Sequence, residues 1–428
     1  MRRCWAPVLV FMLAVGVLGT HSTLHPGGRR GDETDYIFTA RYFAYLFVQH
    51  DLTRPEWGDN YWTHTQPMLI RYIEGAWLSA LGYDLETTPV PYDLMASLEQ
   101  IGDNKVATAP VDASPELVAL ARIPIIGLSG ALVVVLFLIA RLLAGEIAGW
   151  ATVGLLLENT LFRNSMPTIQ PEPALLLALA LSTLILIRPP TSALLRPSRG
   201  RVVAVGIVLG LGLAAKLTAG LGIAAVLLWG ALATWRTAAV ARAGGRPDWL
   251  QASGRVAGSW VAMVLVAGCV FVISDPHLYA NPFVHTAHLV QNRIDEMNVQ
   301  AAVQPAGAIN NPLARPVAVL FGLAGSTITG SRTVSLEGLV MLLGLAPLAL
   351  WTWRDWTRRA ELGPTAFLLV MLVVSFVGTS AGLRMSYDKY YLPVLIWATV
   401  CGGLAVAWLV RAARGEGLFG SPSRNRHD

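Results

Sequence analysis

Three carboxylates within four residues, Asp32, Glu33 and Asp35, mark the short stretch Gly31–Tyr36 as a place where chemistry could occur. The stretch follows an apolar segment, Trp5–Gly19, and precedes an aromatic run, so we expect it beside a membrane surface. Charge at a membrane is costly unless it is solvated or used. A carboxylate held there can accept the proton of a hydroxyl group. Position alone favours an ordinary solvated loop, and the other polar residues of the chain decide between the two interpretations.

Further ionisable residues stand at the ends of apolar segments. They are Glu172 between two prolines, Lys216 after a Gly-Leu-Ala run, Asp275 and His277 around Pro276, and the late group Arg384, Tyr387, Asp388 and Lys389. Each has an ordinary explanation, such as a helix N-cap for Glu172 or a snorkelling side chain for Lys216. Their convergence on one side of one membrane is harder to explain in that way, and it predicts a site.

The combination has a chemical logic. Transfer of a group from a phosphate-linked donor to a hydroxyl needs a carboxylate that takes the hydroxyl proton. It also needs cations that hold the departing phosphate. Carboxylates near Asp32 would accept the proton, and Lys216, Arg384 or Lys389 opposite them would hold the phosphate. An apolar carrier chain attached to that phosphate would lie between helices.

Composition defines the elements that must position these residues. Of the 428 residues, 54% are hydrophobic and 14% are charged, against roughly a quarter charged in soluble proteins. Apolar runs of about 20 residues recur, the length that a helix needs to cross a bilayer. The chain is therefore predicted to be an all-α polytopic membrane protein. Its three cysteines lie in or beside apolar segments without C-x-x-C spacing, which predicts neither a disulfide framework nor a metal cluster.

We expect about ten spanning helices. They are the first segment followed by residues 117–141, 146–161, 172–188, 202–217, 219–235, 256–274, 335–353, 365–383 and 390–410. Residues 20–115 are predicted to form a first external loop with two interfacial helices, near 35–49 and 68–81. The short, glycine-rich stretch 317–328 is predicted to be re-entrant or interfacial. The expected organisation is one membrane domain, 1–412, and a cytoplasmic tail, 413–428.

Basic residues predict the orientation, because cytoplasmic loops collect Lys and Arg. Ten spans with an internal N-terminus place 18 of the 32 basic residues and 6 of the 27 acidic residues on one face, a net charge of +12. The remainder carries 14 basic and 21 acidic residues, a net charge of −7. Both termini are thus predicted to be cytoplasmic in the cell membrane, and a nucleic-acid surface is not indicated.

The N-terminal segment allows two interpretations. Arg2 and Arg3, an apolar stretch and small residues near Gly19 resemble a secretory signal peptide. We favour a retained first helix, because it tethers the acidic stretch to the membrane face.

Five segments resemble one family of membrane enzymes. They are Gly31–Tyr36, Thr65–Leu69, Glu172 at the start of a span, Lys216 after its Gly-Leu-Ala run, and Tyr387–Pro393. They are similar to integral-membrane glycosyltransferases of the GT-C type, specifically the protein O-mannosyltransferases and aminoarabinose transferases that use polyprenyl-phosphate sugars. The resemblance covers roughly residues 1–410. It implies that Asp32 is the general base, that Glu33 stands beside it and that Glu172 is a second acidic position, often aspartate in relatives. Where the mannosyltransferases tend to have His-Pro-Pro this chain has Gln66-Pro67, so the acceptor cannot be carried over.

The resulting hypothesis is an inverting glycosyltransferase acting on the external membrane face. Asp32, Glu33 and Glu172 are the candidate catalytic residues, and Lys216, Arg384 and Lys389 are the candidate phosphate ligands. The candidate substrate contacts are His64, Gln66, Asp275, His277, Tyr387 and Asp388. No cofactor is required, although the three acidic residues could share a divalent metal through oxygen ligands. The partners are a polyprenyl-phosphate sugar, the bilayer and an acceptor of unknown kind.

The alternative hypothesis is a transporter or flippase of lipid-linked sugars that binds substrate with the same acids and makes no bond. It predicts broken helices near the membrane midplane and symmetry between halves. Neither is clear in the sequence.

Overall fold

The computed structural model describes residues 5–25, 31–58, 63, 66–86, 113–188, 194–245, 247–303, 305–326, 333–359 and 362–415. For Gly31, Asp32, Val303, 324–326, 333–334 and 358–359 it describes the backbone alone. His64 and residues 87–112, which belong to the expected first external loop, lie outside the described residues.

The described chain is almost entirely helical. Its first part contains α1 (Ala6–Leu24), α2 (Gly31–Thr39), α3 (Arg41–Phe43), the π-helix η2 (Ala44–Val48), the 3₁₀ turn η3 (Pro55–Trp57) and α5 (Leu69–Ala80). The middle part contains α7 (Pro115–Ala144), α8 (Glu146–Glu158), α9 (Thr160–Ser165), α10 (Glu172–Ile187), α12 (Arg199–Ala215), η4 (Leu217–Ala219), α13 (Gly220–Ala243) and α14 (Trp249–Ile273). The last part contains η5 (Pro276–Leu278), α15 (Pro282–Val303), η6 (Pro305–Gly307), α16 (Ala314–Ala324), α17 (Leu336–Leu343), α18 (Leu345–Arg359), α19 (Pro364–Gly382), η7 (Asp388–Tyr391) and α20 (Leu392–Ala413). The strands β1 (Gly325–Ser326) and β2 (Thr333–Val334) form one short antiparallel pair.

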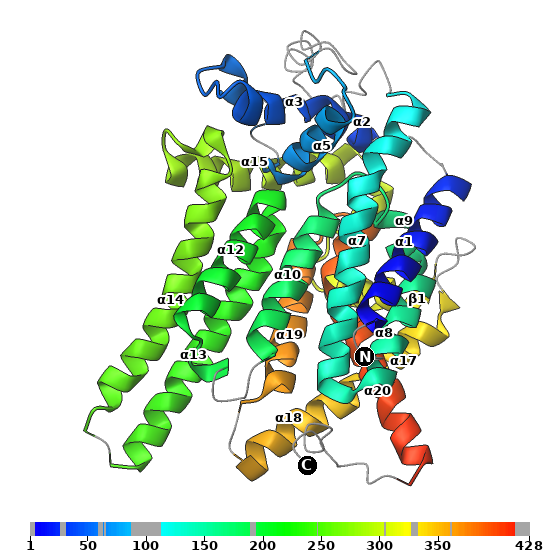
Figure 1. Ribbon diagram of the computed structural model, residues 1–428. Helices are drawn as coiled ribbons and strands as arrows, with labels where there is room; N and C mark the ends of the chain where they lie inside the picture. Colours follow the sequence, from blue (N-terminus) through cyan, green and yellow to red (C-terminus); the bar gives the residue numbers. More distant parts are fainter. Residues whose placement is uncertain are drawn as a thin grey trace.

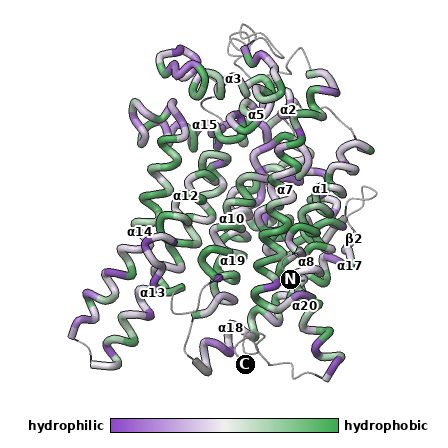
Figure 2. The backbone as a smooth tube through the Cα atoms, viewed as in Figure 1, coloured by the Kyte–Doolittle hydropathy of each residue, from purple (hydrophilic) through white to green (hydrophobic). Residues whose placement is uncertain are grey.

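The long helices stand side by side in one bundle, and α2, α3, α5 and α15 lie across one of its ends (Figure 1). Figure 2 shows hydrophobic residues along the bundle and hydrophilic residues gathering toward its two ends. This is the pattern of a bundle that crosses a bilayer. We call the end that carries α2, α5 and α15 the loop face.

Seven described helical segments are long and apolar enough to cross a membrane, which makes the chain an integral membrane protein. They are Ala6–Leu24, Pro115–Ala144, Leu217–Ala243, Trp249–Ile273, Leu336–Thr357, Pro364–Gly382 and Asp388–Ala413. Each of the other three predicted spans is also a helix, but α8, α10 and α12 have 13, 16 and 17 residues and fall short of that length. The count of ten crossings therefore stays a prediction.

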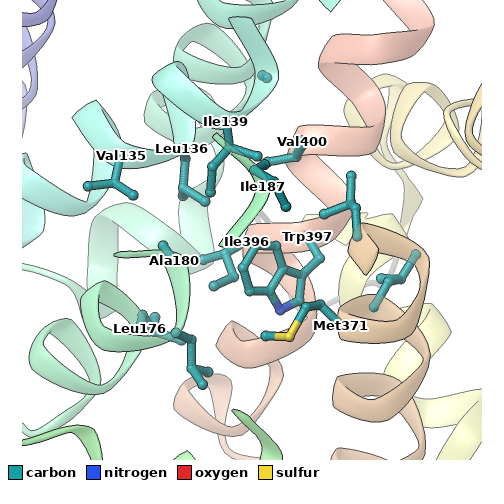
Figure 3. Close-up of a cluster of buried hydrophobic side chains, with 14 of the residues drawn as sticks. Val135, Leu136, Ile139, Leu176, Ala180, Ile187, Met371, Ile396, Trp397 and Val400 are labelled. Carbon is teal, nitrogen blue, oxygen red and sulfur yellow. The ribbon is translucent and has the colours of Figure 1, made fainter. Parts of the chain in front are cut away.

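The bundle is built around α20, which is the most buried of these segments. Trp397 of α20 is fully buried among side chains of α7, α10 and α19 (Figure 3). Its indole N–H donates to Ser375 Oγ at 3.1 Å, which satisfies the one polar atom that the ring brings into the core.

Small residues allow the helices beside the site to approach closely. A Cβ on Gly212 of α12 would stand 2.9 Å from Ala178 Cβ of α10, and one on Gly210 would stand 2.6 Å from the carbonyl oxygen of Ala267 of α14. Small residues at helix contacts are the usual means of tight packing in membranes. Helix α12 is thereby held between α10 and α14, and its last residues are fixed in place.

Two regions were only partly defined by the sequence. Residues 317–328 were expected to be re-entrant or interfacial; the structure has the eleven-residue helix α16 followed by β1, and their place in the membrane stays a prediction. The long helix α15 was not predicted at all, because its polar residues are spread along its length and no apolar run marks it.

Candidate functional site

A cavity of about 340 Å³ lies close to the loop face, where five parts of the chain meet. Its polar lining residues include Glu172, Lys216, Arg293, Lys389 and Tyr390, and its apolar lining includes Leu175, Leu217, Leu221, Met297, Leu383 and Pro393. These residues come from α10, the α12–α13 turn, α15, α19 and the η7–α20 segment. One cavity thus combines cations with apolar walls.

Lys216 is placed by the way in which α12 ends. The helix stops at Ala215, and Lys216 takes an extended conformation (φ −160°, ψ 135°) before the 3₁₀ turn η4 starts the next helix. The Lys216 ammonium lies 2.5 Å from Glu172 Oε1, and Glu172 is 1% exposed. The ammonium is also 5.5 Å from the centroid of the Tyr390 ring, within cation–π range. Glu172 therefore holds Lys216 at the wall of the cavity.

Arg293 of α15 was missed by the sequence analysis, because it sits in a helix that no apolar run announced. Its Nη2 donates to the Tyr390 hydroxyl at 3.0 Å, and its Nη1 pairs with Glu296 one helical turn further on. Burial lowers the pKa of Arg293, but Tyr390, Glu296 and Tyr36 together raise it above the ordinary value, so the guanidinium stays charged. Of the described lining residues, Lys216, Arg293 and Lys389 are cationic and Glu172 alone is acidic. The cavity suits an anion.

The acidic stretch lies in helix α2, and Glu33 is tied to two other segments. Arg122 of α7 donates from Nε to Glu33 Oε1 at 2.8 Å and from Nη2 to Oε2 at 2.7 Å. The backbone N–H of Ile169 donates to Glu33 Oε1 at 2.9 Å, and Arg122 Nη1 donates to Ser22 Oγ at 3.2 Å. Glu33 is 2% exposed. Because both of its oxygens are engaged in hydrogen bonds, its geometry fits an anchor for α2, and its predicted catalytic part beside Asp32 stays a prediction.

Asp32, the candidate base, is described by its backbone alone. Asp32 directly precedes Glu33. The backbone N–H of Ile169, which donates to Glu33, lies three residues before Glu172. The first turn of α2 is thereby fixed beside the loop that leads into α10.

Gln66 is brought toward the cavity from the first loop. The Tyr36 hydroxyl of α2 donates to Gln66 Oε1, and Tyr36 acts electrostatically on Arg293. Tyr36, the last residue of the acidic stretch, therefore lies near the cation-lined cavity.

Asp275 and His277 belong to a different cluster, between α5 and the turn after α14. Asp275 Oδ1 accepts from the backbone N–H of His277 at 3.2 Å, and His277 Nδ1 lies 3.2 Å from the carbonyl oxygen of Trp57. Burial raises the pKa of Asp275 to about 7, while Arg71 of α5 lowers it. Neither Asp275 nor His277 lines the cavity, so the structure does not bring them together with the lysines.

The late polar group divides in a similar way. Lys389 lines the cavity, and the Tyr387 ring lies 5.6 Å from the Tyr390 ring, between centroids. Asp388 is exposed, and Arg384 donates to Asn298 outside the cavity. Arg384 was predicted to bind phosphate, and its bond to an exposed amide directs it elsewhere.

Glu74 of α5 is a further buried acidic residue, which the sequence analysis did not single out. It is fully buried, and neither carboxyl oxygen has a hydrogen-bond partner in the described part of the chain. Burial, with the nearby Glu33 charge, raises the pKa of Glu74 well above its usual range. The side chain is therefore held as a neutral acid.

A metal site was considered among the acidic residues. Across the described residues, no three His, Cys, Asp or Glu side chains gather in a way that would hold an ion. The two oxygens of Glu33 are already hydrogen-bonded, so we derive no step through a metal.

Comparison with known proteins gives a likeness in fold. No family model matches the sequence, and no curated protein matches it. The oligosaccharyltransferase of Archaeoglobus fulgidus, tethered to an acceptor peptide containing the NVT sequon, matches 96% of this chain at 13% identity with a TM-score of 0.51. The same enzyme with an inhibitory peptide and a dolichol-phosphate matches 96% at 12% identity, TM-score 0.52, and its complex with Zn and sulfate matches 96% at 13% identity, TM-score 0.50.

The chain covers 50%, 52% and 50% of the length of those three chains, or about half. At this level of identity the likeness establishes a shared fold. The bundle described above therefore shares its fold with about half of the Archaeoglobus fulgidus oligosaccharyltransferase chain.

Proposed function

We propose that this chain is a glycosyltransferase that moves a sugar from a lipid-phosphate carrier to an acceptor hydroxyl. The observation that carries the proposal is the cavity of about 340 Å³, in which Lys216, Arg293 and Lys389 meet apolar walls. Cations suit the phosphate, and apolar walls between helices suit a polyprenyl chain. A fold shared with an enzyme that has been solved with dolichol-phosphate supports this assignment.

The proposed reaction is a single inverting displacement. The acceptor oxygen attacks C1 of the sugar, the bond between C1 and the phosphate oxygen breaks, and the carrier leaves as lipid phosphate. The proton of the acceptor hydroxyl passes to the Asp32 carboxylate. The negative charge that develops on the phosphate is stabilised by Lys216, Arg293 and Lys389, which are held in place before the reaction begins.

Two acidic residues act in this proposal through other groups. Glu172 fixes the ammonium of Lys216 by the 2.5 Å ion pair. Glu33 fixes α2 against Arg122 and the backbone of Ile169, and so places the residue before it, Asp32. Both are therefore positioning residues, although the sequence had suggested a direct part for each.

The proposed orientation has the loop face outside the cell and both termini in the cytoplasm. The support is the excess of Lys and Arg in the loops at the opposite end of the bundle. Gln66, Tyr387 and the unplaced His64 remain proposed contacts to the sugar or the acceptor.

The experiment that tests the function uses membranes that contain the full-length chain and a panel of radiolabelled polyprenyl-phosphate hexoses and pentoses. We expect transfer of label to an endogenous acceptor, and a loss of about 100-fold or more with Asp32→Asn while donor binding is retained. Lys389→Gln should weaken donor binding itself. Label that crosses the bilayer of reconstituted vesicles without any new glycosidic bond would instead establish the transporter.

A further inference from the structure

A second cavity, of about 540 Å³, lies along α1, and its lining shares no residue with the proposed donor site. It is lined by one stripe of α1 between Met12 and His25 and by Arg163 of α9. Its apolar part lies along the middle of α1, and its polar part lies where α1 reaches the loop face. It therefore has the form of a groove with two chemically different ends.

The polar end has a cation, Arg163, whose hydrogen-bonding capacity is not filled by the described residues. The Nε of Arg163 is buried and has no hydrogen-bond partner among the described residues. Arg163 acts on the Glu337 carboxylate through electrostatics alone, and the hydrogen bond to Glu337 comes from Asn159 Nδ2, at 3.3 Å. A guanidinium is the side chain best suited to a phosphate group.

Two histidines complete the polar end. The rings of His21 and His25 are stacked with centroids 4.5 Å apart, and both residues line the groove. His21 Nε2 lies 3.0 Å from Asn164 Oδ1, which fixes its ring beside the residue that follows Arg163. Polar ring atoms and a cation thus face the same space.

The apolar end is left open by the way in which α1 packs. Val10, Ala14 and Leu18 are buried, whereas Met12 and Leu13 on the neighbouring stripe are 65% and 46% exposed. Helix α1 is one of the segments able to cross the membrane, so this stripe meets lipid. From residue 12 to residue 21 the helix rises by about 14 Å, which provides length for an extended hydrocarbon chain.

We infer that this groove binds one membrane lipid with an anionic headgroup, its phosphate against Arg163 and an acyl chain along the Met12–Val17 stripe. Charge complementarity at one end and exposed apolar surface at the other select an amphiphile. The inference does not depend on the proposed glycosyltransferase activity.

The test uses purified, delipidated full-length protein in detergent, titrated with phosphatidylglycerol or phosphatidylcholine and followed by native mass spectrometry. We expect one phosphatidylglycerol to bind more tightly than phosphatidylcholine. Arg163→Gln should raise the Kd for phosphatidylglycerol by about tenfold or more, since a hydrogen bond to a charged group is worth at least that factor. Arg163→Lys, which keeps the charge, should retain the preference.

A matched pair of glycine variants tests the apolar half of the groove. A Cβ on Gly16 or on Gly19 meets no atom within 4 Å, so both positions have space for a side chain, but only Gly16 lines the groove. Gly16→Leu should weaken binding and Gly19→Leu should leave it unchanged. Equal binding of the two lipids by the unmodified protein, or equal effects of the two glycine variants, would overturn the assignment.

Discussion

Arg122 holds both carboxylate oxygens of Glu33, with 2.8 Å from Nε to Oε1 and 2.7 Å from Nη2 to Oε2, although the two residues are 89 positions apart. Both side chains are buried. The pair ties helix α2 on the loop face to the long helix α7, and with the Ile169 N–H it also ties α2 to the loop before α10. The position of the acidic stretch over the bundle depends on this bidentate contact.

The contact predicts a strong energetic coupling. Glu33→Gln leaves the Arg122 guanidinium buried without its counter-ion, so we expect a loss of about 3–5 kcal/mol of stability, and a similar loss for Arg122→Gln. The double variant should lose clearly less than the two single losses together, because it leaves no buried charge unpaired. Denaturant unfolding of the four proteins in detergent measures this, and strictly additive losses would contradict it.

The cation-lined cavity predicts which basic residues matter for the donor. Lys389→Gln and Arg293→Gln should each raise the Kd for a polyprenyl-phosphate sugar by about tenfold or more, since each removes a charged contact. Arg384→Gln is the matched control: it lies five residues before Lys389, outside the cavity, and should leave the Kd unchanged. Titration with labelled donor measures all three. A larger effect at Arg384 than at Lys389 would place the phosphate elsewhere.

Asp275 predicts a pH dependence of stability. Burial raises its pKa to about 7 from a usual value near 3.8, so the folded protein binds its proton more tightly than the unfolded chain. Stability should therefore fall as the pH rises from about 4 to 7, and this contribution should level off above pH 7. Asp275→Asn removes this pH-dependent contribution to stability and keeps a side-chain oxygen that can accept from the His277 N–H.

The measurement for Asp275 is the melting temperature at pH 5 and at pH 8. Between these values the wild type should lose more stability than Asp275→Asn, by up to a few kcal/mol at about 1.4 kcal/mol per pKa unit. Glu74, whose pKa is also raised, is present in both proteins and cancels in the comparison. Parallel pH profiles would show that Asp275 does not titrate in this range.

Gly344, between α17 and α18, predicts a packing defect. A Cβ there would stand 2.0 Å from the carbonyl oxygen of Cys401 in the central helix α20, and backbone cannot move aside cheaply. Gly344→Ala should lower stability by about 1–3 kcal/mol, the usual cost of overpacking. Gly254→Ala, in α14, meets no atom within 4 Å and serves as the control. Thermal melts in detergent compare them, and equal melting temperatures would contradict the close approach.

The sequence predicted most of the bundle because length and hydropathy are local properties. Each of the ten predicted spans is a helix, and Lys216 and Lys389 stood out because charge at the end of an apolar run is rare. Helix α15, with Arg293, gave no such signal, since a helix lying across the end of the bundle mixes polar and apolar residues. The pairing of Glu33 with Arg122 is a tertiary contact that no local pattern encodes. Arg122 lies inside a predicted span, however, and a cation there was itself a sign of a buried partner.

The third cation of the cavity comes from α15, a helix outside the segments able to cross the membrane, whereas Lys216 and Lys389 sit at the ends of bundle helices. The cationic lining of the cavity is therefore assembled from two kinds of structure, the ends of bundle helices and a separate helix that lies across the loop face. Under the proposed function, changes confined to residues 282–303 would alter which carrier is accepted and leave the packing of the helices beneath as it is.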